Sequence, residues 1–245
     1  KLLWFQKHKP DLWKQTRHVM SISDYLCFLL TGKSVGDSGT ASLSGLQNIQ
    51  EGTWWPEALK IIGITEAMLP VLHRPGAVLG RISREGANIL GLPEGIPVAA
   101  GSLDHHAAGV GCGAGSITEG SESTGTVIAC LRISPAYQPE TGCCIGPDTD
   151  DGRYFRLTIS NMGGSVLKEY RNQHAKDITY SDLDRLASGI EPGSAGLLGE
   201  YIAGAVSGTD FTDCGLHARA IMESVAARMG GLIDSLFPEG RPSQL

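Results

Sequence analysis

The sequence predicts an α/β fold, and three observations support this prediction. Short apolar segments with strand character are followed by segments whose apolar residues recur at helical spacing, which is typical of α/β proteins. The chain has 245 residues, of which 41% are hydrophobic, so it can bury the core of one large domain or two small ones. Glycines cluster between residues 109 and 118, where we expect a boundary between two lobes.

The N-terminal part of the chain is predicted to be mainly helical. An apolar run at residues 2–5 is interrupted by Pro10, after which helical spacing resumes until Gly32, a residue type that commonly ends helices. We expect Thr53 to cap a further short helix that ends at Gly63.

Strands become frequent in the middle of the chain. Residues 75–83 are expected to form a strand and residues 96–102 a buried strand that leads directly into Asp104. A pair of strands over residues 117–134 is expected to be joined by a turn at Thr124 and Gly125. The remaining predicted elements are helices at residues 84–92, 180–189 and 215–237, a strand at residues 153–161, and a helix that begins just after Gly163 and Gly164.

Composition excludes several classes of protein. The formal net charge is −6, so the chain lacks the strongly basic surface that nucleic-acid binding needs. No apolar run approaches the ~20 residues that span a bilayer. The six cysteines show no metal-type spacing and suit free thiols in a reducing compartment. We therefore expect a cytoplasmic protein without nucleic-acid or membrane partners.

Common nucleotide and nucleophile motifs are poorly matched. The Gly-Lys-Ser tripeptide at residues 32–34 lacks the glycine of a phosphate loop five positions earlier, where Cys27 stands. Residues 109–114 fit the G-x-G-x-x-A spacing, but they follow the end of the predicted strand by several residues, whereas a dinucleotide site needs them in the strand-to-helix turn. We also expect no serine-hydrolase elbow.

Asp104 is the first candidate functional residue. An aspartate between a strand and a helix is a favoured helix N-cap, and the same place is where α/β folds bind ligands, so the two interpretations are compatible. An ionised carboxylate there can accept a proton from a substrate hydroxyl. Asp104, His105 and His106 could instead form a metal site, but adjacent helical residues point about 100° apart, which favours partly buried polar roles for the histidines.

Two glycine-containing turns are the next candidates. The turn at Thr124, Gly125 and Thr126 offers backbone N–H groups and hydroxyls that suit phosphate oxygens, although an ordinary hairpin turn has the same sequence. Gly163 and Gly164 precede a predicted helix whose N-terminus favours anions, and they equally fit a tight strand-to-helix turn.

Six ordered segments resemble the sequence patterns of one family. They are KLLWFQKHKPDLW, SISDYLCFLLTGKSVGDSGTAS, LGLPEGIPVAAGSLDHHAAGVGCG, ESTGT, GGSVLKEYRN and HARAIMESVAARM. In content and order they resemble the FGGY family of carbohydrate kinases, which includes kinases of xylulose, ribulose, gluconate and glycerol. The resemblance covers nearly the whole chain.

The resemblance implies a fold and a reaction. It implies an actin-like, ribonuclease-H-like two-lobe fold, present here in part, with residues 1–112 as the C-terminal part of the sugar-binding lobe and residues 113–245 as the N-terminal part of the nucleotide-binding lobe. It implies ATP-dependent phosphorylation of a sugar or polyol with ATP and Mg²⁺ as cofactors. The substrates would be its small-molecule partners, with a homodimer as one option for assembly.

The resemblance also assigns residue roles. Asp104 matches the catalytic base of the family and contributes to the substrate site, and His105 stands where relatives often carry a residue that contacts the sugar. Thr124, Gly125 and Thr126 match the turn near the transferring phosphate, while Gly163 and Gly164 match a loop close to the nucleotide. No protein ligand for a metal is expected.

Several departures from the family pattern leave alternatives open. The family's N-terminal phosphate loop and its C-terminal adenosine segment are not matched, so we expect a fragment or a degenerate member. EYIAGAVSGTDF is shorter than the corresponding stretch of relatives. A catalytically inactive sugar-binding or regulatory protein is the alternative to a kinase, and a metal hydrolase using Asp104, His105 and His106 is a third possibility.

Overall fold

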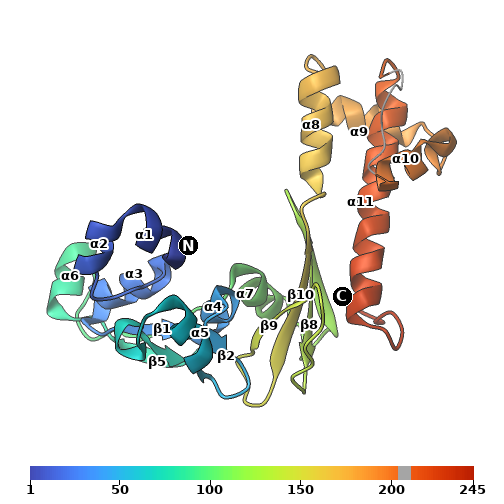
Figure 1. The fold of residues 1–245 in the computed structure, drawn as a ribbon. Coiled ribbons are helices and arrows are strands. Elements are labelled where there is room, and N and C mark those ends of the chain that lie inside the picture. The colour runs from blue at the N-terminus through green and yellow to red at the C-terminus, as the bar shows by residue number, and fades with distance from the viewer. Residues whose placement is uncertain (204–210) are drawn as a thin grey trace. The chain divides into compact units, whose positions relative to one another are not determined.

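The computed structural model describes residues 1–203 and 211–245, and these form two compact units. Unit 1 contains Lys1–Gly111 and Ile133–Arg156, and unit 2 contains Cys112–Arg132 and Leu157–Leu245. Each unit is therefore built from two segments that are separate in the sequence. Figure 1 shows the elements of both units and labels all of the α-helices and many of the strands.

Three helices open unit 1, namely α1 (Leu2–His8), α2 (Pro10–Gln15) and α3 (Ile22–Thr31). The helical spacing after Pro10 predicted continuation to Gly32, but the helix breaks before α3. The break occurs because Ser21 and Asp24 form a capping box, in which each side chain accepts the other's backbone N–H and so starts a new helix. The predicted stop is confirmed, since Gly32 ends α3 in the left-handed conformation with a φ of 71°.

Short strand pairs connect the remaining helices of unit 1. They are β1 (Val35–Asp37) with β4 (Val71–His73) in parallel, β2 (Gln47–Asn48) with β3 (Thr53–Trp54) and β5 (Val78–Arg81) with β6 (Pro97–Ala99), both antiparallel. The strand expected to lead into Asp104 exists as β6, but Pro97 and Ala99 are exposed, so it is not buried as predicted.

Unit 1 also contains several short helices between and after its strands. They are α4 (Ser38–Ala41), η1 (Ser42–Ser44), α5 (Pro56–Ile62), η2 (Glu66–Met68), α6 (Arg84–Leu90) and α7 (Asp104–Gly111). Thr53 does not cap α5, because it pairs in β3 and Trp55 occupies the cap position instead. Gly63 ends α5 in the left-handed conformation, as predicted.

The main sheet has the strand order β7-β8-β10-β9, formed by β7 (Gly120–Thr124), β8 (Ile128–Ser134), β10 (Tyr154–Ser160) and β9 (Cys144–Pro147). The predicted hairpin is confirmed, because β7 and β8 pair antiparallel from Gly120 opposite Arg132 to Thr124 opposite Ile128. The two central strands contain fully inaccessible residues, namely Ile128 of β8 and Phe155 and Leu157 of β10. β8 begins with an apolar run, whereas β10 alternates apolar residues with Arg156 and Thr158, which are buried as well.

Helices form the rest of unit 2. They are α8 (Gly164–His174), α9 (Tyr180–Ser188), η3 (Ser194–Gly196), α10 (Leu197–Ala203) and α11 (Cys214–Leu236), and α11 packs against α8, α9 and α10 (Figure 1). Asp213 caps α11 by accepting the N–H of Leu216 at 2.9 Å. The shortened stretch between Glu200 and Phe211 lies largely outside the described residues. Over residues 1–203 and 211–245, no helix has the length and apolar character needed to cross a bilayer.

The buried face of α11 agrees only in part with the helical spacing in its sequence. Ala218 and Ile221 are completely buried, as the spacing predicted. Farther along, Val225 and Met229 are only half-buried. His217 is fully buried instead, because its Nδ1 lies 2.9 Å from the Tyr201 hydroxyl and its ring stacks on Tyr170.

A left-handed turn before α10 is held by a carboxylate of α11. Four consecutive residues have positive φ, namely Gly193 (91°), Ser194 (50°), Ala195 (51°) and Gly196 (90°). The non-glycine members of such a run are strained, so other contacts must compensate. Glu223 does so by accepting the Ser194 hydroxyl at 2.8 Å and the Gly193 N–H at 3.1 Å.

Replacing Glu223 by glutamine tests this anchor. The Ser194 hydroxyl lowers the pKa of the Glu223 carboxyl most, and Arg219 and the Gly193 N–H add to the effect against the opposing influence of burial. We expect Glu223→Gln to lower the free energy of unfolding by roughly 1–2 kcal/mol at neutral pH, the size of a lost charge-assisted hydrogen bond. Urea unfolding measures this difference.

The same experiment has a pH dependence of defined sign. Because the folded-state pKa is depressed, the carboxylate's contribution is fully present above the unfolded value of about 4.3 and is lost as the pH falls through the folded-state pKa. The gap between wild type and Glu223→Gln should therefore shrink near pH ~3. An unchanged gap contradicts the anchor, and the exposed Glu169→Gln on α8 is the control.

Candidate active site

Asp104 lies at the first turn of α7 in unit 1. The N–H of Ala107 donates to the Leu103 carbonyl at 2.9 Å, so Leu103 occupies the cap position and Asp104 is the first helical residue, one position later than predicted. The Asp104 carboxylate is exposed and accepts the N–H of His105 at 2.7 Å. A carboxylate in this turn is stabilised by the helix dipole and stays available for other partners.

His106 points into unit 1 rather than toward solvent. It is completely buried, its Nδ1 lies 2.7 Å from the Ser102 Oγ, and its Nε2 lies 2.8 Å from the Asp148 Oδ1. Its ring also stacks on Phe155, with centroids 4.7 Å apart. The roles of Ser102 and Asp148 were not predicted from the sequence, because the separation of 42 positions between His106 and Asp148 leaves no local signal that could reveal them.

This arrangement speaks against a metal site at these three residues. Asp104 is exposed while His106 is buried against Asp148, so their side chains do not converge. No group of three His, Cys, Asp or Glu side chains suited to a metal occurs within the described part of the chain. His105 is half-buried beside Asp104 in the same helical turn, and its contact with a sugar remains a prediction.

The Asp148 carboxyl is ionised at neutral pH. Burial acts to raise its pKa, but hydrogen bonds from His106 and the Thr149 backbone, together with the charge of Arg153, outweigh burial and hold the pKa below its ordinary value. An ionised Asp148 accepts a hydrogen bond from the Nε2–H group of His106. In the neutral imidazole, Nδ1 then accepts the hydroxyl proton of Ser102.

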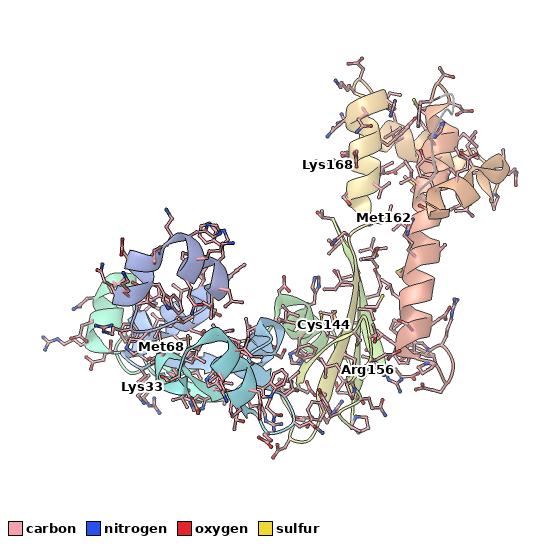
Figure 2. All side chains as sticks on the ribbon, viewed as in Figure 1. Lys33, Met68, Cys144, Arg156, Met162 and Lys168 are labelled. Carbon is pink, nitrogen blue, oxygen red and sulfur yellow. The ribbon has the colours of Figure 1, made fainter. Side chains whose placement is uncertain are left out.

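The second candidate region, in unit 2, unites two glycine turns. The Gly125 carbonyl accepts the N–H of Gly164 at 2.7 Å, and the Thr126 carbonyl accepts the N–H of Ser165 at 3.4 Å. The β7–β8 turn therefore lies directly against the start of α8, close to Met162 (Figure 2). The structure brings together the two sequence-predicted turns, which are 37 positions apart when counted from Thr126 to Gly163.

The glycines of this region serve different purposes. A Cβ on Gly163 would lie 2.9 Å from the Gly125 carbonyl oxygen, and a Cβ on Gly164 would lie at the same distance from that atom. The double glycine thus makes room for the hairpin backbone, and the first N–H groups of α8 bond to that backbone instead of remaining open to an anion. Gly125 differs, because it has no atom within 4 Å of its Cβ position and no positive φ.

Gly125 is accordingly a glycine that the fold does not require. It is exposed between Thr124 and Thr126, which are exposed too. The Thr124 hydroxyl donates to Glu122 and lies 3.7 Å from the sulfur of Met229 on α11. An exposed turn with a bare backbone position leaves space for a ligand to approach closely.

The motif assignments are settled by their secondary structure. Gly32 ends α3, and residues 109–111 lie inside α7, so neither forms a phosphate-binding strand-to-helix turn. The G-x-S-x-G spacing does occur once, at residues 32–36, contrary to the expectation of no elbow spacing. A nucleophile elbow needs a strand before the serine and a helix after it, whereas Ser34 follows α3 and precedes β1, with its Oγ buried.

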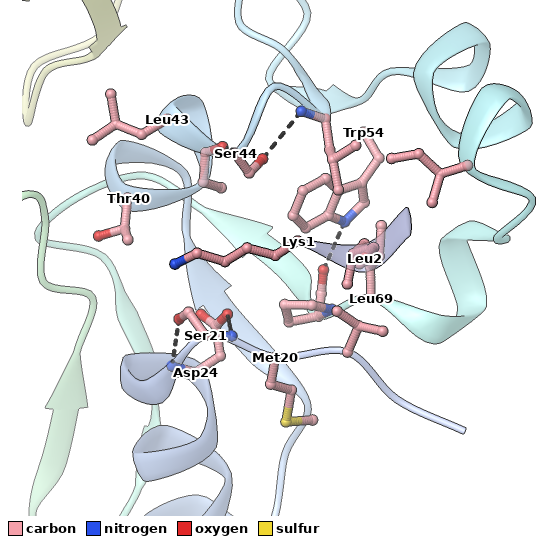
Figure 3. A pocket seen from close by; sticks show the side chains of 15 residues that line it. Lys1, Leu2, Met20, Ser21, Asp24, Thr40, Leu43, Ser44, Trp54 and Leu69 are labelled. Carbon is pink, nitrogen blue, oxygen red and sulfur yellow. Dashed lines mark hydrogen bonds between the residues drawn. The ribbon is translucent and has the colours of Figure 1, made fainter. Parts of the chain in front are cut away.

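A pocket of about 440 Å³ also lies in unit 1. Its walls are mainly apolar, with Trp54 and Leu69 among them, and Lys1, Asp24 and Thr40 contribute polar groups (Figure 3). Asp104 is not part of it, so the pocket and the candidate base are separate features.

Comparisons with known proteins agree with the resemblance. Residues 1–111 match the N-terminal domain of the FGGY family of carbohydrate kinases. An autoinducer-2 kinase of Escherichia coli is 26% identical over 210 residues, which cover 81% of this chain and 40% of that protein. The structure resembles a xylulose kinase from Lactobacillus acidophilus with a TM-score of 0.81, at 26% identity over 96% of this chain and 51% of that one.

A gluconate kinase from Lactobacillus acidophilus is similar to the same extent. It has a TM-score of 0.82 and 26% identity, and the match covers 98% of this chain and 52% of that one. The fold class is therefore confirmed as the α/β, actin-like fold of these kinases, in part. These similarities support the resemblance of the chain to the FGGY family of carbohydrate kinases. The chain spans about half the length of those two structures and 40% of the length of the autoinducer-2 kinase.

The close approach of the two turns gives a testable pair of substitutions. Gly163→Ala places a methyl group against backbone atoms that cannot move aside, so we expect the free energy of unfolding to fall by about 1–3 kcal/mol. Gly125→Ala meets open space, so its effect should stay within about 0.5 kcal/mol. Urea unfolding of both variants measures the contrast, and equal losses would contradict the packing described here.

Proposed function

We propose that the protein to which this chain belongs transfers the terminal phosphoryl group of ATP to a hydroxyl group of a sugar or polyol. The match of residues 1–111 to the N-terminal domain of the FGGY family supports this proposal, and the similar proteins named above are kinases of small molecules. The observation that carries it is the exposed carboxylate of Asp104 in the first turn of α7, at the position that matches the catalytic base of the family.

In this proposal Asp104 acts as the general base. Its carboxylate orients the attacking hydroxyl and accepts its proton as the bond to phosphorus forms. The exposure of Asp104 and its single hydrogen bond to the His105 N–H leave lone pairs for a substrate hydroxyl. His105, half-buried on the same turn, is assigned to the sugar site.

The exposed β7–β8 turn is assigned to the phosphates of ATP. The bare backbone of Gly125 and the two flanking threonines suit phosphate oxygens, and Gly163 and Gly164 hold that turn against α8. Mg²⁺ would neutralise phosphate charge when bound, and it usually keeps several waters and few protein ligands. A cytoplasmic location is part of this proposal, because the free cysteines suit a reducing compartment.

The proposal includes a division of labour along the chain. Residues 1–112 would supply the C-terminal part of the sugar-binding lobe, and residues 113–245 the N-terminal part of the nucleotide-binding lobe. The match of residues 1–111 to the family's N-terminal domain supports the first assignment. Positioning of the two substrates and electrostatic stabilisation would do most of the catalytic work.

The substitution Asp104→Asn in the full-length protein tests the base. An amide cannot accept the proton, so kcat should fall by roughly 100-fold or more while the KM for the sugar changes little. A coupled assay of ADP formation across a panel of pentuloses, gluconate and polyols supplies the measurement. The exposed Asp11→Asn on α2 is the matched control.

Two results would decide against the proposal. Turnover of Asp104→Asn near the wild-type rate would remove Asp104 from the role of base. Sugar binding by the wild-type protein without sugar-dependent ADP formation would favour the inactive sugar-binding or regulatory alternative.

A second substitution tests the phosphate turn. Gly125→Ala adds one methyl group to an exposed position that the fold leaves open, so it should raise the KM for ATP or lower kcat several-fold while stability is kept. Gly231→Ala on α11 also meets open space and should leave both constants unchanged. Unaltered kinetics in Gly125→Ala would argue against phosphate contact at this turn.

A further inference from the structure

Ser102, His106 and Asp148 form a hydrogen-bonded triad in the core of unit 1, and the proposed reaction does not use it directly. Its two hydrogen bonds are 2.7 Å and 2.8 Å long and meet on one imidazole ring. We propose that this triad is a positioning relay that fixes the first turn of α7 and thereby the direction of Asp104. The proposal rests on the proposed function, in which Asp104 is the base.

A hydrolytic role for the triad is excluded by packing. A Cβ on Gly39 would lie 2.2 Å from the Ser102 Oγ, so the hydroxyl packs closely against α4. The imidazole and the Asp148 carboxylate are also buried, with exposed side-chain fractions of 0% and 4%. The three groups therefore act on the structure around them.

The sequence positions of the triad place Asp104 at its centre. Ser102 lies two residues before Asp104 and His106 two residues after it, so their hydrogen bond spans the candidate base. The backbone bond from the Ala107 N–H to the Leu103 carbonyl closes the same turn. The exposed carboxylate is thus bracketed by two anchored residues.

Asp148 ties this turn to a rigid part of unit 1. It directly follows β9, and its backbone N–H donates to the Arg153 carbonyl at 3.0 Å, which closes the connection to β10. Phe155 of β10 supports the other side of the relay by stacking on the imidazole. The start of α7 is consequently held by the β9–β10 connection through a buried, directional contact.

Such an anchor matters because a general base must be placed within about 0.5 Å of its productive position. A misplacement of about 1 Å can cost roughly 100-fold in rate. His106 does not contact a reacting atom in this proposal. It acts through the position of Asp104.

Three variants of the full-length protein test the relay. His106→Leu removes both hydrogen bonds and keeps an apolar side chain in the core. His106→Gln retains a donor for Asp148 and an acceptor for Ser102. Trp54→Phe is the control, because it removes another buried hydrogen bond of unit 1, from the indole N–H to the Pro70 carbonyl at 2.9 Å.

The kinetic readout is the partition of ATP between sugar and water. His106→Leu should lower kcat for sugar phosphorylation by roughly 10- to 100-fold with little change in the sugar KM, because the base is misplaced while binding groups remain. The rate of ATP hydrolysis without sugar should not decrease in His106→Leu. His106→Gln should recover most of the rate, and Trp54→Phe should keep the wild-type partition at a similar loss of stability.

The structural readout does not depend on activity. Hydrogen exchange of the Ala107 amide should accelerate at least about tenfold in His106→Leu and stay unchanged in Trp54→Phe. Unchanged exchange in His106→Leu overturns the relay even if the wild-type protein proves inactive. Faster exchange with an unchanged kcat overturns its role in catalysis, whereas a wild-type protein without sugar-dependent ADP formation rejects the proposed function itself.

Discussion

The burial of one imidazole decides the geometry of unit 1 around the candidate base. His106 is enclosed by Ser102, Asp148 and Phe155, and a buried polar ring needs partners for both nitrogens. Because the face of α7 that carries His106 packs into the core, the orientation of the helix is fixed. Asp104 is then exposed at the first turn. The exposure of Asp104 is therefore a consequence of the burial of His106, two residues away.

Unit 2 depends on a comparable constraint made only of backbone. The turn between β7 and β8 bonds to the first N–H groups of α8, and this approach is close enough to exclude any side chain at Gly163 or Gly164. Gly125 contrasts with them, because nothing within the chain needs the missing side chain there. Gly163 and Gly164 are therefore required by the packing of the turn, whereas Gly125 leaves space beside it.

The fold that the chain shares with known carbohydrate kinases brings together residues that are far apart in the sequence. The chain follows FGGY kinase structures over almost its whole length while spanning about half of theirs. Within that framework, the triad at Ser102, His106 and Asp148 is a feature that the family resemblance did not predict. Its origin lies in the way that α7 packs beside the β9–β10 connection.

The sequence alone predicted the α/β class, the resemblance to the FGGY kinases, the β7–β8 hairpin and the stops at Gly32 and Gly63, because these depend on local periodicity, turn chemistry and ordered motifs. Local pattern misplaced the cap at Thr53, since pairing with Asn48 in β2 outweighed capping preference. Only the tertiary structure decided that His106 is buried and that the two glycine turns meet. Those outcomes arise from contacts between distant segments, which leave no trace in the spacing of neighbouring residues.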